Sequence, residues 1–91
     1  MSFRIRHNPP AHRFETRVDN HECVLDYKLD GDVMTLTYTG VPQAVAGLGI
    51  ASALVEAALA TARSKAWKVI PTCSYALRWM EKHHEFDDLR A

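Results

Sequence analysis

Two closely spaced glycines mark the junction between an apolar run and a long helical pattern. Gly47 and Gly49 lack Cβ atoms, so the backbone between them can approach a ligand closely. Unpaired amides and the dipole at a helix N-terminus attract an anion such as a pyrophosphate. The junction therefore predicts an anion site made of backbone. The alternative is that the glycines only permit a tight turn and close packing of the helix on a sheet. The segment is Val41-Pro42-Gln43-Ala44-Val45-Ala46-Gly47-Leu48-Gly49-Ile50-Ala51-Ser52.

Cys73 is a second candidate for chemistry, because Ser74 directly after it can cap a helix. A helix N-terminus stabilises a thiolate, so Cys73 is a candidate nucleophile or acyl acceptor. The alternative is a small buried apolar side chain. Cys23 alternates in phase with Leu25 and is predicted to lie in the core. The two cysteines lack the close spacing of a metal or redox pair, and we expect both to remain thiols.

Other phosphate-binding and metal-binding templates fit poorly. A P-loop has Lys-Ser/Thr after its last glycine, where this chain has Ile50-Ala51, and the dinucleotide-binding fingerprint needs three spaced glycines. His83 and His84 are adjacent and diverge on a helix, and the other histidines are scattered. We therefore expect surface roles for the histidines and no metal site.

The composition predicts one small domain covering residues 1–91. The chain has 11 basic and 11 acidic residues, and 47% of its residues are hydrophobic. A net charge of zero argues against partners such as nucleic acid or an anionic membrane. Residues 45–60 are apolar, but the run is shorter than the ~20 residues that a bilayer requires and contains Ser52 and Glu56. Without a secretory signal, the expected location is cytoplasmic.

Alternation of apolar and polar residues predicts three antiparallel strands. They cover residues 13–18, 23–29 and 33–41, with turns at Asp19-Asn20 and Asp30-Gly31-Asp32. A further short strand is expected at residues 3–6. The three strands over residues 13–41 would form an antiparallel meander, which this short strand would precede.

After Pro42 the period changes to three and four residues. It predicts an amphipathic helix from about residue 47 to 65, a strand at 68–72, and a second helix that Ser74 begins. The first helix then connects two parallel strands in a right-handed crossover. The expected fold class is α+β, with a mixed, mainly antiparallel sheet, a central βαβ crossover and a second, C-terminal helix. The second helix would place three apolar residues on the sheet: Leu77, Trp79 and Met80.

These motifs resemble those of the GNAT acetyltransferases, the GCN5-related N-acetyltransferases. Their motif A, Arg-x-x-Gly-x-Gly/Ala at a strand-to-helix junction, is matched by residues 46–51 except at its first position. The chain is most similar to the compact GNAT-like proteins, in which Val-Pro precedes Arg-Gly-x-Gly-Ile-Ala and a Pro-x-Cys-Ser-Tyr motif follows. Here the flanking motifs are Val41-Pro42 and residues 71–75, and the resemblance covers residues 14–89.

The resemblance implies an enzyme that binds acetyl-coenzyme A and transfers the acetyl group to an amine. In that fold the strands before and after the first helix splay apart, and the pantetheine arm enters the gap. The loop amides hold the pyrophosphate. The implied coenzyme-binding residues are Thr39, Gly40, Val41, Ala46, Gly47, Leu48, Gly49, Ile50, Ala51, Ser52 and Tyr75.

The resemblance implies Cys73 and Tyr38 as catalytic residues, and the chain departs from the family pattern at two positions. Ala46 stands where relatives have an arginine, and Tyr38 where many have a histidine. A tyrosine is a poor base at neutral pH but a workable acid for a leaving thiolate. These departures favour an alternative, a non-catalytic module that binds or senses coenzyme A. The acceptor is unknown; a protein or peptide amine and a monomer or homodimer are both compatible with so short a chain.

Overall fold

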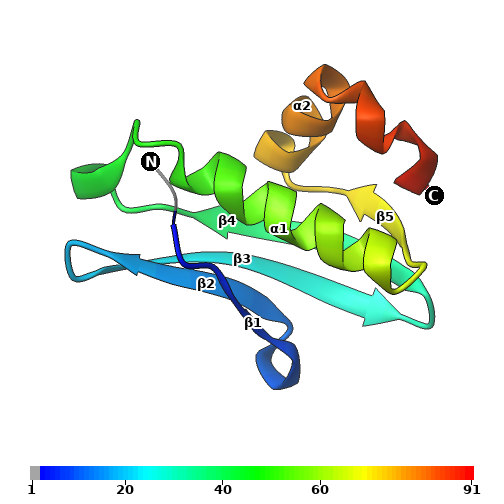
Figure 1. The fold of residues 1–91 in the computed structure, drawn as a ribbon, viewed down its shortest axis with the longest axis horizontal. Helices are drawn as coiled ribbons and strands as arrows, with labels where there is room; N and C mark the ends of the chain where they lie inside the picture. The colour runs from blue at the N-terminus through cyan, green and yellow to red at the C-terminus, as the bar shows by residue number, and fades with distance from the viewer. Residues whose placement is uncertain (1–2) are drawn as a thin grey trace.

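The computed structural model describes residues 3–91, which form a five-stranded sheet in the order β1-β2-β3-β4-β5 and two α-helices. Helix α1 lies across the sheet, and α2 lies beside β5 (Figure 1). Both helices contribute to the same hydrophobic core as the buried side chains of the strands. The α+β class and the mixed sheet are confirmed.

The central strands are β2 (Arg13–Val18), β3 (His21–Asp30) and β4 (Val33–Gly40). They pair antiparallel, as the alternation predicts. In the middle of these strands one set of alternating side chains is buried, and the other set is charged, hydroxyl-bearing or only partly buried. Cys23 is completely buried, as predicted.

The first strand is β1 (Arg6–Asn8), so the expected strand at residues 3–6 is wrong in position. Polar contacts to β2 set its register: Arg6 Nη2 and Asn8 Nδ2 donate to the two carboxylate oxygens of Glu15 at 2.9 and 3.2 Å. The apolar alternation of Phe3 and Ile5 continues outside the paired region, where it packs against the core. Hydrophobic pattern alone therefore could not locate the pairing.

Helix α1 (Ile50–Ser64) begins three residues later than predicted. Gly47 and Gly49 have φ angles of 81° and 88°, which belong to the left-handed region and exclude them from the helix. Helix α2 (Ser74–Lys82) also differs at its start, because Cys73 and not Ser74 is the N-cap residue. No helix within residues 3–91 is long and apolar enough to cross a bilayer.

The predicted crossover is confirmed, because β5 (Lys68–Pro71) pairs parallel with β4 from Val33↔Lys68 to Leu36↔Pro71. A C-terminal 3₁₀-helix (His84–Leu89) then returns along α1 and β5. Asp88 accepts two hydrogen bonds from the Arg63 guanidinium of α1, at 2.8 and 3.1 Å. The amide of Ala91 donates to the carbonyl of Val69, so the last residues bond to β5.

The surface position expected for the histidines holds for His12 and His84, which are exposed, whereas His7 and His83 are half-buried against aromatic rings. His7 Nε2 and the Tyr27 hydroxyl form a hydrogen bond of 2.7 Å, and the His7 ring stacks on Phe14 at 4.2 Å. Burial, helped by the positive charge of Lys65, lowers the pKa of His7. The fold therefore disfavours the protonated form of this ring. His83 is also half-buried, against Trp79.

We predict that His7 makes folding stability depend on pH near neutrality. Because the folded-state pKa of His7 is lowered, its contribution is complete above the ordinary value of about 6.5 and is lost as the pH falls through the folded pKa. His7→Gln keeps an acceptor for Tyr27 but does not titrate, so this part of the dependence should disappear. Urea unfolding between about pH 7.5 and 5 measures it. Identical pH profiles for both proteins would contradict the assignment.

Candidate active site

The site lies where β4 and β5 separate. Their parallel pairing ends at Leu36↔Pro71, and the amides of Thr72 and Cys73 both donate to the carbonyl oxygen of Leu36, at 3.1 and 3.0 Å. Beyond this point β4 continues to Gly40, while the segment that follows β5 turns into α2. The regular pairing of the two strands thus ends at Leu36 and Pro71, and we call the region beyond this point the gap.

A β-bulge in β4 precedes the gap. Leu36 pairs with Tyr27 and Tyr38 with Asp26, which leaves Thr37 without a partner in β3. The Thr37 hydroxyl donates instead to the carbonyl of Asp26 at 3.2 Å. A bulge changes the direction of the side chains that follow it. No feature of the sequence indicated this irregularity, because the run of alternating threonines around it looks regular.

Thr39 and Cys73 face each other across the gap, with 3.5 Å between Oγ1 and Sγ. Burial by itself disfavours the Cys73 thiolate, but the Thr39 hydroxyl and nearby amides of Tyr75 and Ala76 outweigh it, so the pKa of Cys73 is lowered. Neither amide makes a hydrogen bond of normal capping geometry to the sulfur. The half-buried thiol therefore has the electrostatic setting of a reactive cysteine.

Tyr38, the other predicted catalytic residue, is 56% exposed. Its ring lies over Gly40, where an added Cβ would come within 2.7 Å of the ring. Val41, next along the chain, is half-buried. The side chain of Thr39, rather than that of Tyr38, contacts Cys73.

The loop before α1 presents a series of free amides. Within residues 3–91, the amides of residues 47–52 form no hydrogen bond with the rest of the backbone, and the first helical bond runs from Ala53 N to Gly49 O. Gly49 is the N-cap and offers no side chain to satisfy them. The amide of Ala46 is already used, because it donates to Gln43 O at 3.1 Å. The contact predicted between Ala46 and the coenzyme must therefore be made by atoms of Ala46 other than its amide.

The two loop glycines are needed for backbone conformation, not for packing. A Cβ built on Gly47 or Gly49 meets nothing within 4 Å, which excludes close helix-to-sheet packing as their purpose. Leu48 between them is exposed, whereas Ile50 is buried and can offer only its amide. Ala51 is half-buried. The loop is thus an open, positively polarised concavity at the start of α1.

Ser52 and Tyr75 lie in the first turns of α1 and α2. Burial raises the pKa of Tyr75, and the Ser52 hydroxyl beside it partly offsets this effect. Ser52 Oγ also accepts a hydrogen bond from Trp79 Nε1 at 2.7 Å. The spacing of Trp79 in the sequence predicts only a place in the core and does not indicate a polar partner.

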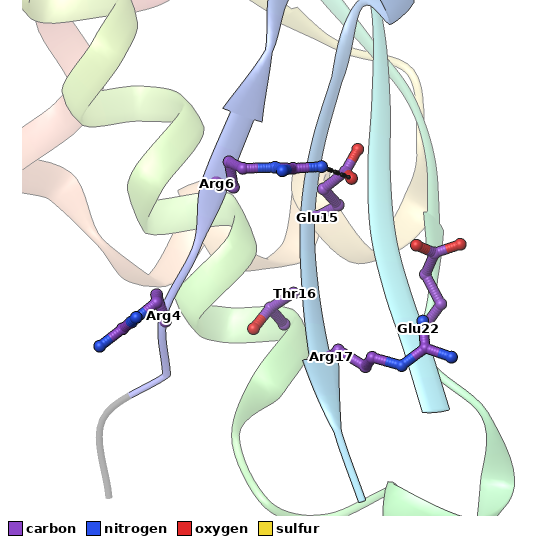
Figure 2. Close-up of a pocket in the computed structure, with 6 residues that line it drawn as sticks. All are labelled: Arg4, Arg6, Glu15, Thr16, Arg17 and Glu22. Atoms are coloured by element: carbon purple, nitrogen blue, oxygen red, sulfur yellow. Dashed lines mark hydrogen bonds and ion pairs between the residues drawn. The ribbon is translucent and has the colours of Figure 1, made fainter. Parts of the chain in front are cut away.

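Two hollows lie outside the gap. One, of about 600 Å³, runs along α1 from Gly49 and Ser52 and is closed on one side by Phe3 and Ile5. The other, of about 320 Å³, lies at the edge formed by β1, β2 and β3. Figure 2 shows that Arg6 reaches Glu15 there, whereas Arg4 points away from them. Three arginines and two glutamates line it, and this mixture of charges gives it no clear preference for an anion.

Comparisons with known proteins identify the family and the fold. Residues 13–89 match the model of the GCN5-related N-acetyl-transferase family. The chain therefore belongs to this family. An NMR structure of a GCN5-like protein from Staphylococcus aureus is similar, with a TM-score of 0.78 and 26% identity over 100% of this chain and 91% of that one.

We predict that Gly47→Ala damages the loop as well as stability. An L-residue in the left-handed region costs about 1 kcal/mol of unfolding free energy, and the strain should displace the free amides. The matched control is Gly31→Ala, since Gly31 also has a positive φ, 59°, but lies in the turn between β3 and β4. Both variants should lose similar stability in urea unfolding. Only Gly47→Ala should weaken acetyl-coenzyme A binding in calorimetry; equal affinities would contradict the assignment of the loop.

A second prediction concerns the thiol. Thr39→Val preserves shape but removes the hydroxyl that lowers the pKa of Cys73, so the thiolate fraction at pH 7 falls. The rate of reaction with a chromogenic disulfide reagent should drop by about two- to tenfold. Cys23→Ser is the control, because Cys23 is fully buried and should not contribute to the signal. An unchanged rate in Thr39→Val would show that the contact does not activate the thiol.

Proposed function

We propose that this protein binds acetyl-coenzyme A and transfers its acetyl group to an amine. The free amides of residues 47–52 would hold the pyrophosphate, and the pantetheine arm would run along Thr39, Gly40 and Val41 in the gap between β4 and β5. The observation that carries the proposal is the position of this gap, which leads from the start of α1 to Cys73. Membership of the family supports it independently.

In the direct reaction, the neutral amine attacks the thioester carbonyl and the bond from carbonyl carbon to coenzyme sulfur breaks. Backbone amides at the gap would stabilise the negative charge on the carbonyl oxygen. The proton released by the amine passes to solvent, and the leaving thiolate takes a proton from the exposed Tyr38 hydroxyl or from water. Tyr38 then regains its proton from solvent.

A covalent variant uses Cys73. Its thiolate attacks the thioester and becomes acetylated as the coenzyme thiolate leaves, and the amine then takes the acetyl group and releases the Cys73 thiolate. The lowered pKa of Cys73 and its contact with Thr39 support this route. A mass increase of one acetyl group, lost in Cys73→Ala, is its expected signature.

A module that binds or senses coenzyme A without turnover is the second candidate. Two observations favour it: Ala46 provides no positive side chain, and its amide is engaged with Gln43. Such a module would retain the loop and the gap but release no thiol in the presence of amines. We place either activity in the cytoplasm, with a protein or peptide amine as the expected acceptor of the enzyme.

The test has two steps. We expect calorimetry to detect acetyl-coenzyme A binding, and an absence of binding at millimolar ligand would contradict both candidates. A thiol-release assay with small amines and lysine-containing peptides then separates them, because only the enzyme produces free coenzyme A. In the enzyme, Cys73→Ala abolishes the covalent route, and Tyr38→Phe slows release if the phenol protonates the thiolate. Unchanged turnover in both variants would remove these residues from the mechanism.

A further inference from the structure

The indole of Trp79 connects α2 to the first turn of α1 through one hydrogen bond. Trp79 is 7% exposed, and its Nε1 donates to Ser52 Oγ at 2.7 Å. The ring stacks on His83 with 3.6 Å between centroids and lies 5.6 Å from Phe86. His83 Nδ1 in turn donates to the carbonyl of Trp79 at 2.6 Å. Packing and hydrogen bonding therefore hold the indole in one orientation.

Ser52 connects the Trp79 indole to the segment of free amides at residues 47–52, which we call the anion loop. It is the third residue of α1, and its amide is one of the free amides at the helix start. An indole N–H can only donate, so the bond occupies a lone pair of Ser52 Oγ and leaves the hydroxyl proton available. Ser52 thereby joins α1 to the Trp79 side chain of α2.

The same two helices carry the two halves of the proposed coenzyme site. The free amides stand at the start of α1, and Cys73 is the N-cap of α2. Acetyl-coenzyme A would have to reach both, and its pantetheine arm has a limited length. A shift of one helix start relative to the other would therefore lose one set of contacts.

We propose that Trp79 is a positioning residue for the coenzyme. Through its hydrogen bond to Ser52 it keeps the anion loop at a fixed distance from Cys73. This inference rests on the proposed function. The positioning role belongs to the indole N–H and not to the packing of the ring, because a phenylalanine at position 79 would retain the contacts with His83 and Phe86. The hydrogen bond, and not the aromatic surface, determines the spacing of the two half-sites.

Trp79→Phe removes the N–H and keeps a ring. We expect the Kd for acetyl-coenzyme A to rise about three- to tenfold, as for the loss of one hydrogen bond. Adenosine diphosphate, which reaches only the α1 amides, should bind as it does to the wild type. Trp67→Phe is the matched control, because Trp67 lies just past the other end of α1, where its amide donates to Ala62 O. It should leave both affinities unchanged.

Ser52→Ala provides a second route to the same bond and keeps the test decisive if Trp79→Phe does not fold. It should raise the Kd for acetyl-coenzyme A by a similar factor, and the double variant should be no weaker than the single ones. If the wild type binds no acetyl-coenzyme A, the proposed function fails. If the wild type binds acetyl-coenzyme A but both single variants bind it as tightly as Trp67→Phe does, the positioning role is wrong. It is also wrong if both single variants lose affinity for acetyl-coenzyme A and for adenosine diphosphate by the same factor.

Discussion

The carbonyl oxygen of Leu36 is the point on which the site depends. It accepts hydrogen bonds from the amides of Thr72 and Cys73 and from the hydroxyl of Thr72. These bonds replace the parallel ladder, so β5 stops pairing while β4 continues. The chain then enters α2 with Cys73 as its first capping residue, opposite Thr39. A gap in the sheet and a thiol beside it are two consequences of one local change in hydrogen bonding.

The positive potential of the site comes from backbone rather than from side chains. The protein has no net formal charge, and position 46 carries no cation. Two glycines at positive φ instead leave six successive amides, those of residues 47–52, without backbone partners at the start of α1. An overall charge count cannot detect such a site, because every peptide group is formally neutral.

The contacts between the helices and the C-terminal segment give this small fold its rigidity around the gap. Trp79 bonds to the first turn of α1, and Arg63 near the end of α1 bonds to Asp88. Both ends of α1 are thus attached to the segments that follow β5. The Arg63 and Asp88 side chains are largely exposed, so packing of the aromatic side chains near them contributes more of this constraint than the ion pair.

The sequence by itself determined the element order, the parallel crossover and the location of the glycine loop before α1, because periodicity and glycine spacing are local properties. It also indicated Cys73 through the residues that follow it. The tertiary structure decided the register of β1, the bulge at Thr37 and the facing of Thr39 and Cys73. It also decided the Trp79 bond to Ser52. Each of these depends on partners distant in sequence, and hydrogen bonds between such partners leave no pattern in a single chain.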